Sequence, residues 1–350
     1  MFCIKRSQLS IRAAFAVVLA AISLQAQARP LDAISGEERL SRLNEITHVP
    51  WDGQVTEKDN GGSFGCRKTE VDITYVDPTD GVRRPLRINM FSPGTNDRIP
   101  AVLVIPTILG TTQLEPIIGN RLCRAGMAAL VADVNDTSQP QEMPSWGIED
   151  VKNRRALVAL RTVLDYAERS PRFDPNRLAI MGSSMGGITS AMLAGLEPQR
   201  LKAIIINVGG GNLPFTLAYS DNGTVGELRK RRMEHMRTGD PAAYEEQLRL
   251  TVKYDPIYFA GSAVRERVLV VQARRDVSVP FVIQEELASA LGEPSKIVYD
   301  SGHVDAIVSL VLWRMGEVVD FLNSRFEGRS MNIFVKELEP ESAAQPAPLL

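Results

Sequence analysis

Cysteine and histidine are scarce in this chain, which has 350 residues and three of each. Cys3 lies in a leader-like start, and Cys66 and Cys123 lack the spacing that typifies a metal site. These two cysteines could pair in an oxidising compartment, but we expect two separate, structurally quiet thiols. The shortage of histidine leaves few candidates for a catalytic base.

The chain also lacks a strong excess of either charge. It has 40 lysines and arginines against 42 aspartates and glutamates, which gives a formal net charge of −2. Cleavage of the leader described below would remove three basic residues and leave a charge of −5. Because a mildly acidic chain has no overall attraction to nucleic acid or anionic lipid, we expect neither as a partner.

Sequence motifs for metals and phosphates are missing too. Gly209-Gly210-Gly211 follows a predicted strand, but it lacks the Lys and the Ser or Thr of a phosphate-binding loop. We interpret these glycines as a hinge. The sequence therefore predicts no metal and no cofactor.

No apolar run beyond the first 28 residues is long enough to span a membrane. At the start, three basic residues precede the apolar run Ala13–Leu24, and Ala26-Gln27-Ala28 follows it as a cleavage site. We predict a signal peptide over residues 1–28, cleaved near Ala28, and a secreted or periplasmic protein without stable membrane insertion. An uncleaved membrane anchor is the alternative.

Short runs rich in Val, Ile and Leu alternate with helical patterns, which indicates a parallel sheet with helices on both faces. The predicted strands lie near 71–75, 86–90, 101–105, 128–134, 178–181, 203–206, 268–271 and 296–299. The predicted helices span about 150–169, 186–196, 281–291 and 304–326.

One interval between strands, from Asn207 to Val268, is too long for a normal crossover. We predict a helical cap there, which with Trp146 would line a substrate pocket. Its basic run Arg229-Lys230-Arg231-Arg232 could meet an anionic substrate, but we expect a solvated helix face. The predicted segments are a lead-in (29–65), a core (66–208 and 263–328), the cap insertion (209–262) and a disordered tail (338–350).

The segment Gly182-Ser183-Ser184-Met185-Gly186 has the form G-x-S-x-G and lies where an apolar strand gives way to a helix. This is typical of a nucleophile elbow, a sharp and crowded turn that exposes the central serine. The glycines leave room where a side chain would clash. Ser184 is therefore the candidate nucleophile, with an ordinary serine in a tight turn as the alternative.

A serine hydroxyl needs a base to remove its proton, and histidine suits neutral pH. His48 lies before the core, and His235 lies in a charged stretch of the insertion. His303 instead follows the last predicted strand, and sites of parallel sheets collect at the carboxyl ends of strands. We predict His303 as the base.

The third member of such a site orients the imidazole. Asp276 ends the loop after the strand at 268–271, which is also the carboxyl end of a strand. Asp300 and Asp305 are rivals because they flank the predicted base. A side chain so near in sequence seldom reaches the far ring nitrogen, so we favour Asp276.

An attacked carbonyl develops a negative oxygen, which needs preorganised N–H donors. We predict the backbone amide of Met185 as one donor. The other should come from the loop after the strand at 101–105, where we favour Ile108 and keep Thr107 and Leu109 as alternatives.

From about Thr69 to Phe326 the chain resembles the α/β-hydrolase superfamily. The stretch from Phe173 to Gly187 is similar to the dienelactone-hydrolase-like and prolyl-oligopeptidase-like branches, in which an Asp-Pro-x-Arg stretch commonly precedes the elbow. The resemblance implies an eight-stranded, mostly parallel sheet and a Ser-Asp-His triad in the chain order Ser184, Asp276, His303.

These observations predict an exported serine hydrolase that cleaves a carboxylic ester through an acyl-enzyme. One alternative is an acyltransferase that passes the same acyl group to an alcohol or sugar. The other is a non-catalytic binding protein that keeps the fold.

Overall fold

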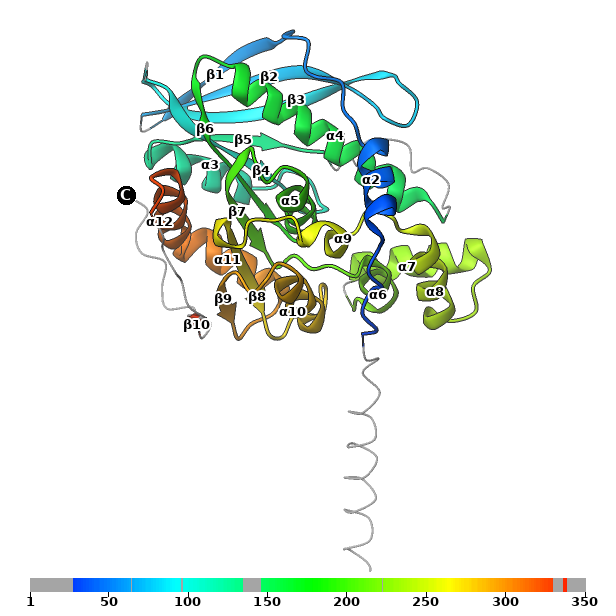
Figure 1. The fold of residues 1–350 in the computed structure, drawn as a ribbon. Coiled ribbons are helices and arrows are strands. Elements are labelled where there is room, and N and C mark those ends of the chain that lie inside the picture. Colours follow the sequence, from blue (N-terminus) through cyan, green and yellow to red (C-terminus); the bar gives the residue numbers. More distant parts are fainter. Residues whose placement is uncertain are drawn as a thin grey trace, which may run out of the picture.

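The computed structural model describes residues 28–63, 65–95, 97–134, 146–221, 223–329 and 336–338. Within them the chain forms one sheet with helices on both faces, as the sequence predicts (Figure 1). Residues 1–27 of the predicted signal peptide and residues 339–350 of the predicted tail lie outside the described residues.

The sheet has ten strands in the order β1-β2-β3-β5-β4-β6-β7-β8-β9-β10. The strands are β1 (Thr56–Ser63), β2 (Cys66–Val76), β3 (Arg83–Pro93), β4 (Ile99–Ile105), β5 (Ala128–Ala132), β6 (Phe173–Ser183), β7 (Leu201–Asn207), β8 (Val268–Ala273), β9 (Ser295–Tyr299) and β10 (Lys336–Leu338). All pairings from β5 to β10 are parallel, and the pairings β1–β2, β2–β3 and β3–β5 are antiparallel. The carboxyl ends of the parallel strands therefore meet at one edge, where the site lies.

The eight predicted strands correspond to β2–β9, and the described sheet adds β1 and β10 at its two edges. Strand β1 lies in the lead-in, where we expected loose structure. Its sequence is polar and glycine-rich, so pairing with β2, and not an alternating pattern, makes it a strand. The lead-in also holds helix α2 (Gly36–Glu45), which begins where the Ser35 side chain accepts from the Glu38 amide at 3.0 Å.

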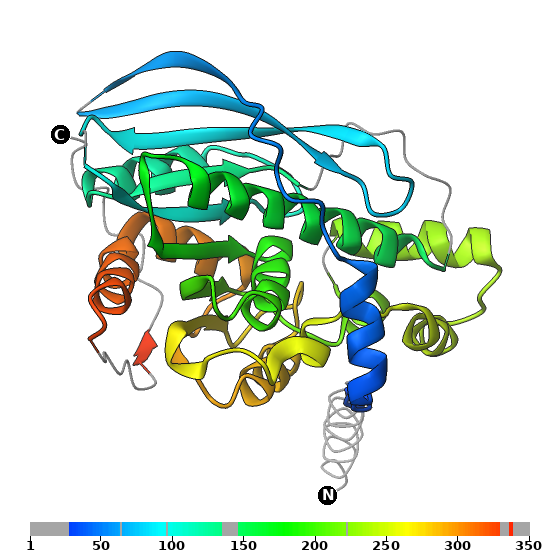
Figure 2. The same cartoon turned by 45° about the horizontal axis from the view of Figure 1, so that its top comes forward.

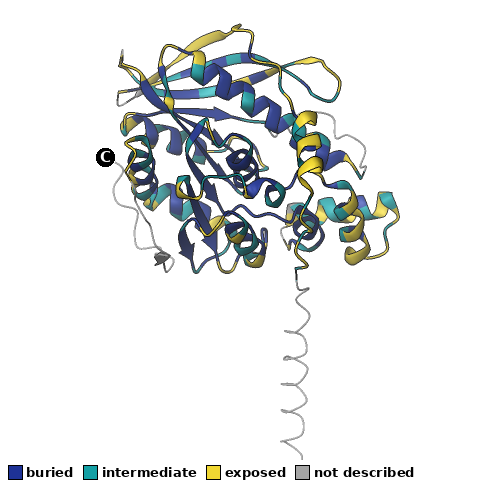
Figure 3. Ribbon diagram, in the orientation of Figure 1, coloured by how far each residue is buried: buried dark blue, intermediate teal, exposed yellow. Residues whose placement is uncertain are grey.

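Helices lie on both faces of the sheet (Figure 2), and a cluster of buried apolar residues lies on each face. Figure 3 shows that the central strands are buried. Besides α2, the helical segments are α3 (Leu114–Arg124), α4 (Ile148–Arg169), α5 (Met185–Leu196), α6 (Leu213–Tyr219), α7 (Gly223–Met236), α8 (Pro241–Thr251), α9 (Pro256–Ala260), the short η1 (Arg265–Arg267), α10 (Phe281–Ala290), α11 (His303–Trp313) and α12 (Met315–Phe326). Helices α4, α5 and α10 pack on one face, and α3, α11 and α12 on the other. The helix predicted over 304–326 is in fact two, divided at Arg314.

The long interval after β7 is helical, as predicted, and holds α6, α7, α8 and α9. An ion pair and a contact between aromatic rings attach this insertion to the core. The Arg232 guanidinium is buried and pairs with Glu149 of α4, and Trp146 lies 5.8 Å from the Tyr244 ring. Arg229 donates to backbone carbonyls of the same insertion at 2.8 and 3.1 Å. Only part of the basic run therefore faces solvent.

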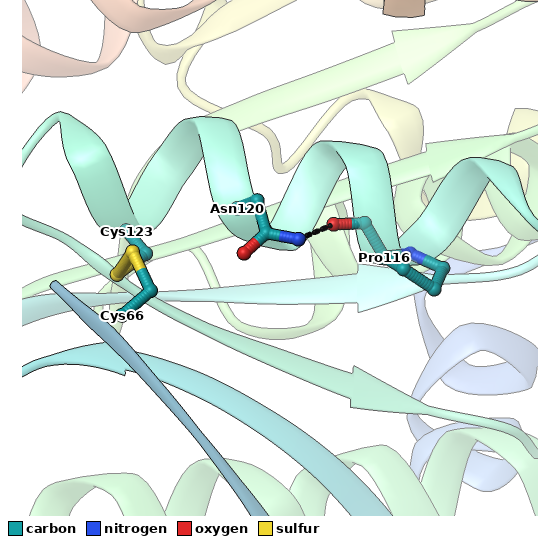
Figure 4. The surroundings of a disulfide bond; sticks show 4 residues. All are labelled: Cys66, Pro116, Asn120 and Cys123. Carbon is teal, nitrogen blue, oxygen red and sulfur yellow. Dashed lines mark hydrogen bonds between the residues drawn. A yellow bond between two sulfur atoms is a disulfide. The ribbon is translucent and has the colours of Figure 1, made fainter. Parts of the chain in front are cut away.

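Cys66 and Cys123 form a disulfide, so the expectation of two separate thiols is wrong (Figure 4). Cys66 pairs in register with Pro93, and nearby Phe91 pairs with Ala129 at the start of β5. The disulfide thus lies at the edge where the parallel strands begin, opposite the edge that holds the site. The spacing of the two cysteines does not indicate the pair, because the packing of α3 against β5 and β3, with β2 paired to β3, is what brings Cys123 to the start of β2.

Replacing both cysteines with alanine should lower the free energy of unfolding by about 4 kcal/mol, because the crosslink closes a loop 57 residues long in the unfolded chain. Urea denaturation of the wild type and the double variant measures this difference. Equal unfolding midpoints and slopes would contradict it.

The lead-in is fastened to α4 by a buried carboxylate. Asp165 accepts from the His48 imidazole at 3.0 Å, from the Trp51 amide at 3.0 Å and from Arg200 at 2.8 Å. Burial alone would raise the pKa of Asp165, but the hydrogen bonds from His48 and Trp51, with the charges of His48 and Arg200, lower it to about 2. His48 therefore has a structural partner far from the nucleophile.

The lowered pKa predicts acid sensitivity of the fold. The ionised Asp165 stabilises the folded chain above its unfolded pKa near 4, and this contribution is lost as pH falls through about 2. The wild type should thus lose about 2 kcal/mol more unfolding free energy than Asp165→Asn between pH 5 and pH 2. Urea titrations at both pH values test this, with exposed Asp305→Asn as the matched control. Parallel pH profiles for wild type and Asp165→Asn would contradict it.

Candidate active site

Ser184 sits in a strained turn between β6 and α5. Its backbone has φ 55° and ψ −119°, a conformation that residues other than glycine rarely adopt. A Cβ atom at Gly182 would lie 2.1 Å from the Gly186 carbonyl oxygen, and one at Gly186 would lie 2.3 Å from the Ile105 oxygen. The predicted need for small residues on both sides of the serine is confirmed.

The turn is held from the neighbouring strand. The Ser184 amide donates to the Asn207 carbonyl at 2.9 Å, and the Asn207 side chain donates to Ser183 at 2.9 Å. These contacts leave the Ser184 hydroxyl directed at the edge of the sheet. There it meets a ring nitrogen.

His303 begins α11 directly after the loop that follows β9. Its Nε2 lies 2.9 Å from the Ser184 Oγ. The side chain is mostly buried, which keeps the imidazole in one place. The other two histidines are elsewhere, since His48 bonds Asp165 and His235 is exposed on α7.

Asp276 lies on the far side of the imidazole, with its Oδ2 2.6 Å from His303 Nδ1. Its other oxygen, Oδ1, accepts from the amides of Ser278 and Val279 at 2.8 and 2.9 Å. The carboxylate is buried and aimed at the ring. An ionised carboxylate here favours the tautomer with a proton on Nδ1, which leaves Nε2 free to accept from the serine.

The rival acids do not reach the ring in the same way. Asp300 lies 3.3 Å from the Arg275 guanidinium, and Asp305 is exposed. The structure therefore brings together the three side chains that the sequence singled out, Ser184, His303 and Asp276. They come from three separate loops at the carboxyl edge of the sheet.

Two backbone amides are candidates for binding a developing oxyanion. Met185 is the first residue of α5, and the first amides of a helix have no partner within it. In the loop after β4, the Leu109 amide donates to Thr107 Oγ1 at 3.3 Å and the Gly110 amide to the Thr107 carbonyl at 3.0 Å. Among the described residues the Ile108 amide has no hydrogen bond, which favours it over Leu109.

One contact of the site was not predicted. The Gln284 side chain in α10 donates to Asp276 Oδ2 at 2.9 Å. Helical periodicity places this residue on a buried face, but it gives no sign of a bond to a loop eight positions earlier. Only the fold shows it.

Within the described ranges, no cluster of three or more His, Cys, Asp or Glu side chains could hold a metal ion. No helix there combines the length and apolar character needed to cross a bilayer.

Comparison with known proteins agrees with this architecture. Residues 147–304, which hold all three side chains, match the Prolyl oligopeptidase family. The chain is 29% identical over 141 residues to a probable 2-oxo-3-(5-oxofuran-2-ylidene)propanoate lactonase of Bradyrhizobium sp., which covers 39% of this chain and 55% of that protein. It is 33% identical over 119 residues to cutinase est1 of Thermobifida alba, which covers 33% and 37%. The chain thus spans about half or less of the length of these curated relatives.

Solved structures show the fold. The acetyl xylan esterase of Paenibacillus sp. R4 superposes with a TM-score of 0.60 at 17% identity, covering 81% of this chain and 96% of that one. Acetyl xylan esterase 1 of Thermoanaerobacterium sp. JW/SL YS485 gives 0.59 at 16% identity, covering 83% and 92%. The chain has the α/β-hydrolase fold, with a mostly parallel sheet and a helical insertion.

Proposed function

We propose that this protein is a serine hydrolase that cleaves a carboxylic ester. The observation that carries the proposal is the double contact of His303, at 2.9 Å to Ser184 and 2.6 Å to Asp276. A row of nucleophile, base and orienting acid is the arrangement that acyl transfer needs.

In the first half of the reaction, His303 Nε2 takes the proton from Ser184 as the Oγ atom bonds to the substrate carbonyl carbon. Asp276 stabilises the imidazolium that forms. The amides of Met185 and Ile108 donate to the negative oxygen, and each such donor typically contributes a factor of ~10² to 10³ in turnover. The imidazolium then gives its proton to the leaving alkoxide, which departs as the alcohol.

In the second half, water attacks the acyl-enzyme. His303 takes a proton from the water, and the same amides hold the second oxyanion. Collapse of this intermediate releases the carboxylic acid and returns the proton to Ser184. The chain's own residues account for every proton transfer.

Exposed apolar residues next in sequence to the site residues support a substrate with an apolar part. Three large apolar side chains are exposed next in sequence to site residues: Leu109 at 69%, Val277 at 54% and Val304 at 64%. The relatives are named as cutinases and a lactonase, which supports an ester or lactone as the bond that is cleaved.

Hydrolysis of p-nitrophenyl acetate, butyrate and octanoate by the purified protein tests the proposal. We expect saturable release of p-nitrophenol, with free acid as the product even when a second alcohol is added. No turnover above the buffer rate on these esters or on a simple lactone would contradict it. Transfer of the acyl group to the added alcohol would point instead to an acyltransferase.

We also propose that the protein is exported, to the periplasm or the medium, after cleavage near Ala28. The signal-like start supports this, and so does the Cys66–Cys123 disulfide, since such bonds persist in oxidising compartments. N-terminal sequencing of the protein from cell fractions tests the proposal. Recovery of intact chain in the cytoplasm alone would contradict it.

A further inference from the structure

Gln284 has a complete set of hydrogen bonds around the acid of the site. Its side chain is 2% exposed. Its Nε2 donates to Asp276 Oδ2 at 2.9 Å and to the Val279 carbonyl at 2.8 Å, while its Oε1 accepts from the Ala273 amide at 3.1 Å. The Ala273 amide needs an acceptor and the carboxylate needs a donor, so these partners set the orientation of the side-chain amide.

With this bond, the Asp276 carboxylate has partners on every side. Two backbone amides hold Oδ1, and Gln284 and His303 share Oδ2. The backbone amides act on one oxygen only. Among the contacts of the described residues, Gln284 is therefore a side chain, besides the imidazole itself, that restrains the oxygen on which His303 depends.

We propose that Gln284 is a positioning residue for the reaction above: it holds Asp276 Oδ2 in line with His303 Nδ1, and it acts on catalysis only through that carboxylate. This inference rests on the proposed function. Its physical basis is that a buried carboxylate without one of its donors rotates toward the remaining ones. A rotation that misplaces Oδ2 misplaces the imidazole that must reach Ser184.

Gln284→Met tests the inference, because methionine keeps the size and removes the donor to Asp276, together with the oxygen that accepts from the Ala273 amide. We expect kcat on p-nitrophenyl butyrate to fall by about 10- to 100-fold with KM nearly unchanged, the loss typical of a misplacement near 1 Å. The decisive comparison repeats the substitution in Asp276→Asn protein. There the further loss should be less than about twofold, since the residue through which Gln284 acts is gone.

Gln272→Met is the matched control. Gln272 is a buried glutamine of β8, 1% exposed, whose side-chain amide has no hydrogen bond within the described residues. The kcat of the Gln272→Met variant should stay within about twofold of the wild-type value. An equal kcat loss from Gln284→Met in both Asp276 backgrounds would overturn the inference and indicate a general structural role.

A second measurement does not depend on esterase activity. The proton shared between His303 Nδ1 and Asp276 should give a low-field proton resonance, which His303→Ala would remove. Gln284→Met, or Gln284→Glu if the first variant does not fold, should shift or broaden that resonance. An unchanged resonance would overturn the inference even with an active enzyme. If the wild type is inactive but substitution of Gln284 still changes the resonance, the result counts against the proposed function and not against the positioning role of Gln284.

Discussion

Ser184→Ala is expected to lower kcat on p-nitrophenyl butyrate by about 10⁶-fold, because alanine removes the only atom that can form the acyl-enzyme. The small residual rate should come from the oxyanion donors and from substrate binding. Initial rates at saturating substrate, with enzyme concentration raised for the variant, measure the loss. The fold should be unchanged, since the hydroxyl faces the imidazole and no core group depends on it.

The neighbouring serine offers a matched control. Ser183 lies in the same turn, but its hydroxyl accepts from Asn207 in the interior. Ser183→Ala should therefore cost about tenfold or less in kcat, through the loss of one buried hydrogen bond. Substantial turnover by Ser184→Ala, or a larger loss in Ser183→Ala, would refute the assignment of the nucleophile.

Asp276→Asn is expected to lower kcat by about 10⁴-fold, because an amide at this position favours the wrong imidazole tautomer and cannot stabilise the imidazolium. KM should change little, since Asp276 is buried behind His303 and does not face the substrate. Steady-state kinetics over a range of pH measures both quantities.

Asp300→Asn and Asp305→Asn are the controls for that result. Both acids flank His303 in sequence, but neither bonds the ring among the described residues. Each variant should keep kcat within about threefold of wild type, as surface substitutions usually do. A large loss in either, with an active Asp276→Asn, would show that the sequence and the geometry both point to the wrong acid.

The grouping of Ser184, His303 and Asp276 could be predicted because each of them has a local signal in the sequence. The G-x-S-x-G segment marks Ser184 by the space that the turn needs, and the structure shows the close contacts that demand it. With three histidines in the chain, their positions relative to the strands were enough to single out His303. The interior strands could also be predicted. Their continuous apolar runs, typical of strands buried on both faces, differ from the pattern in the rest of the sequence.

The features that escaped prediction depend on contacts between distant segments. Strand β1 has no apolar pattern and exists by pairing with β2. The Cys66–Cys123 bond depends on the packing of α3 against the strands beside β2, which the spacing of the cysteines does not encode. Gln284 meets Asp276 only because α10 turns back over the loop it follows. The lead-in helix α2 did carry a signal, the Ser35 cap with Glu38 three residues on.

Labelling of the native protein with a fluorophosphonate probe, followed by peptide mapping, tests whether Ser184 is the activated nucleophile. We expect one adduct, on the peptide that carries Ser184, and its loss in His303→Ala, because the probe needs a serine activated by a base. An unlabelled wild type, an adduct on another serine, or equally fast labelling without His303 would contradict the assignment of Ser184 and His303.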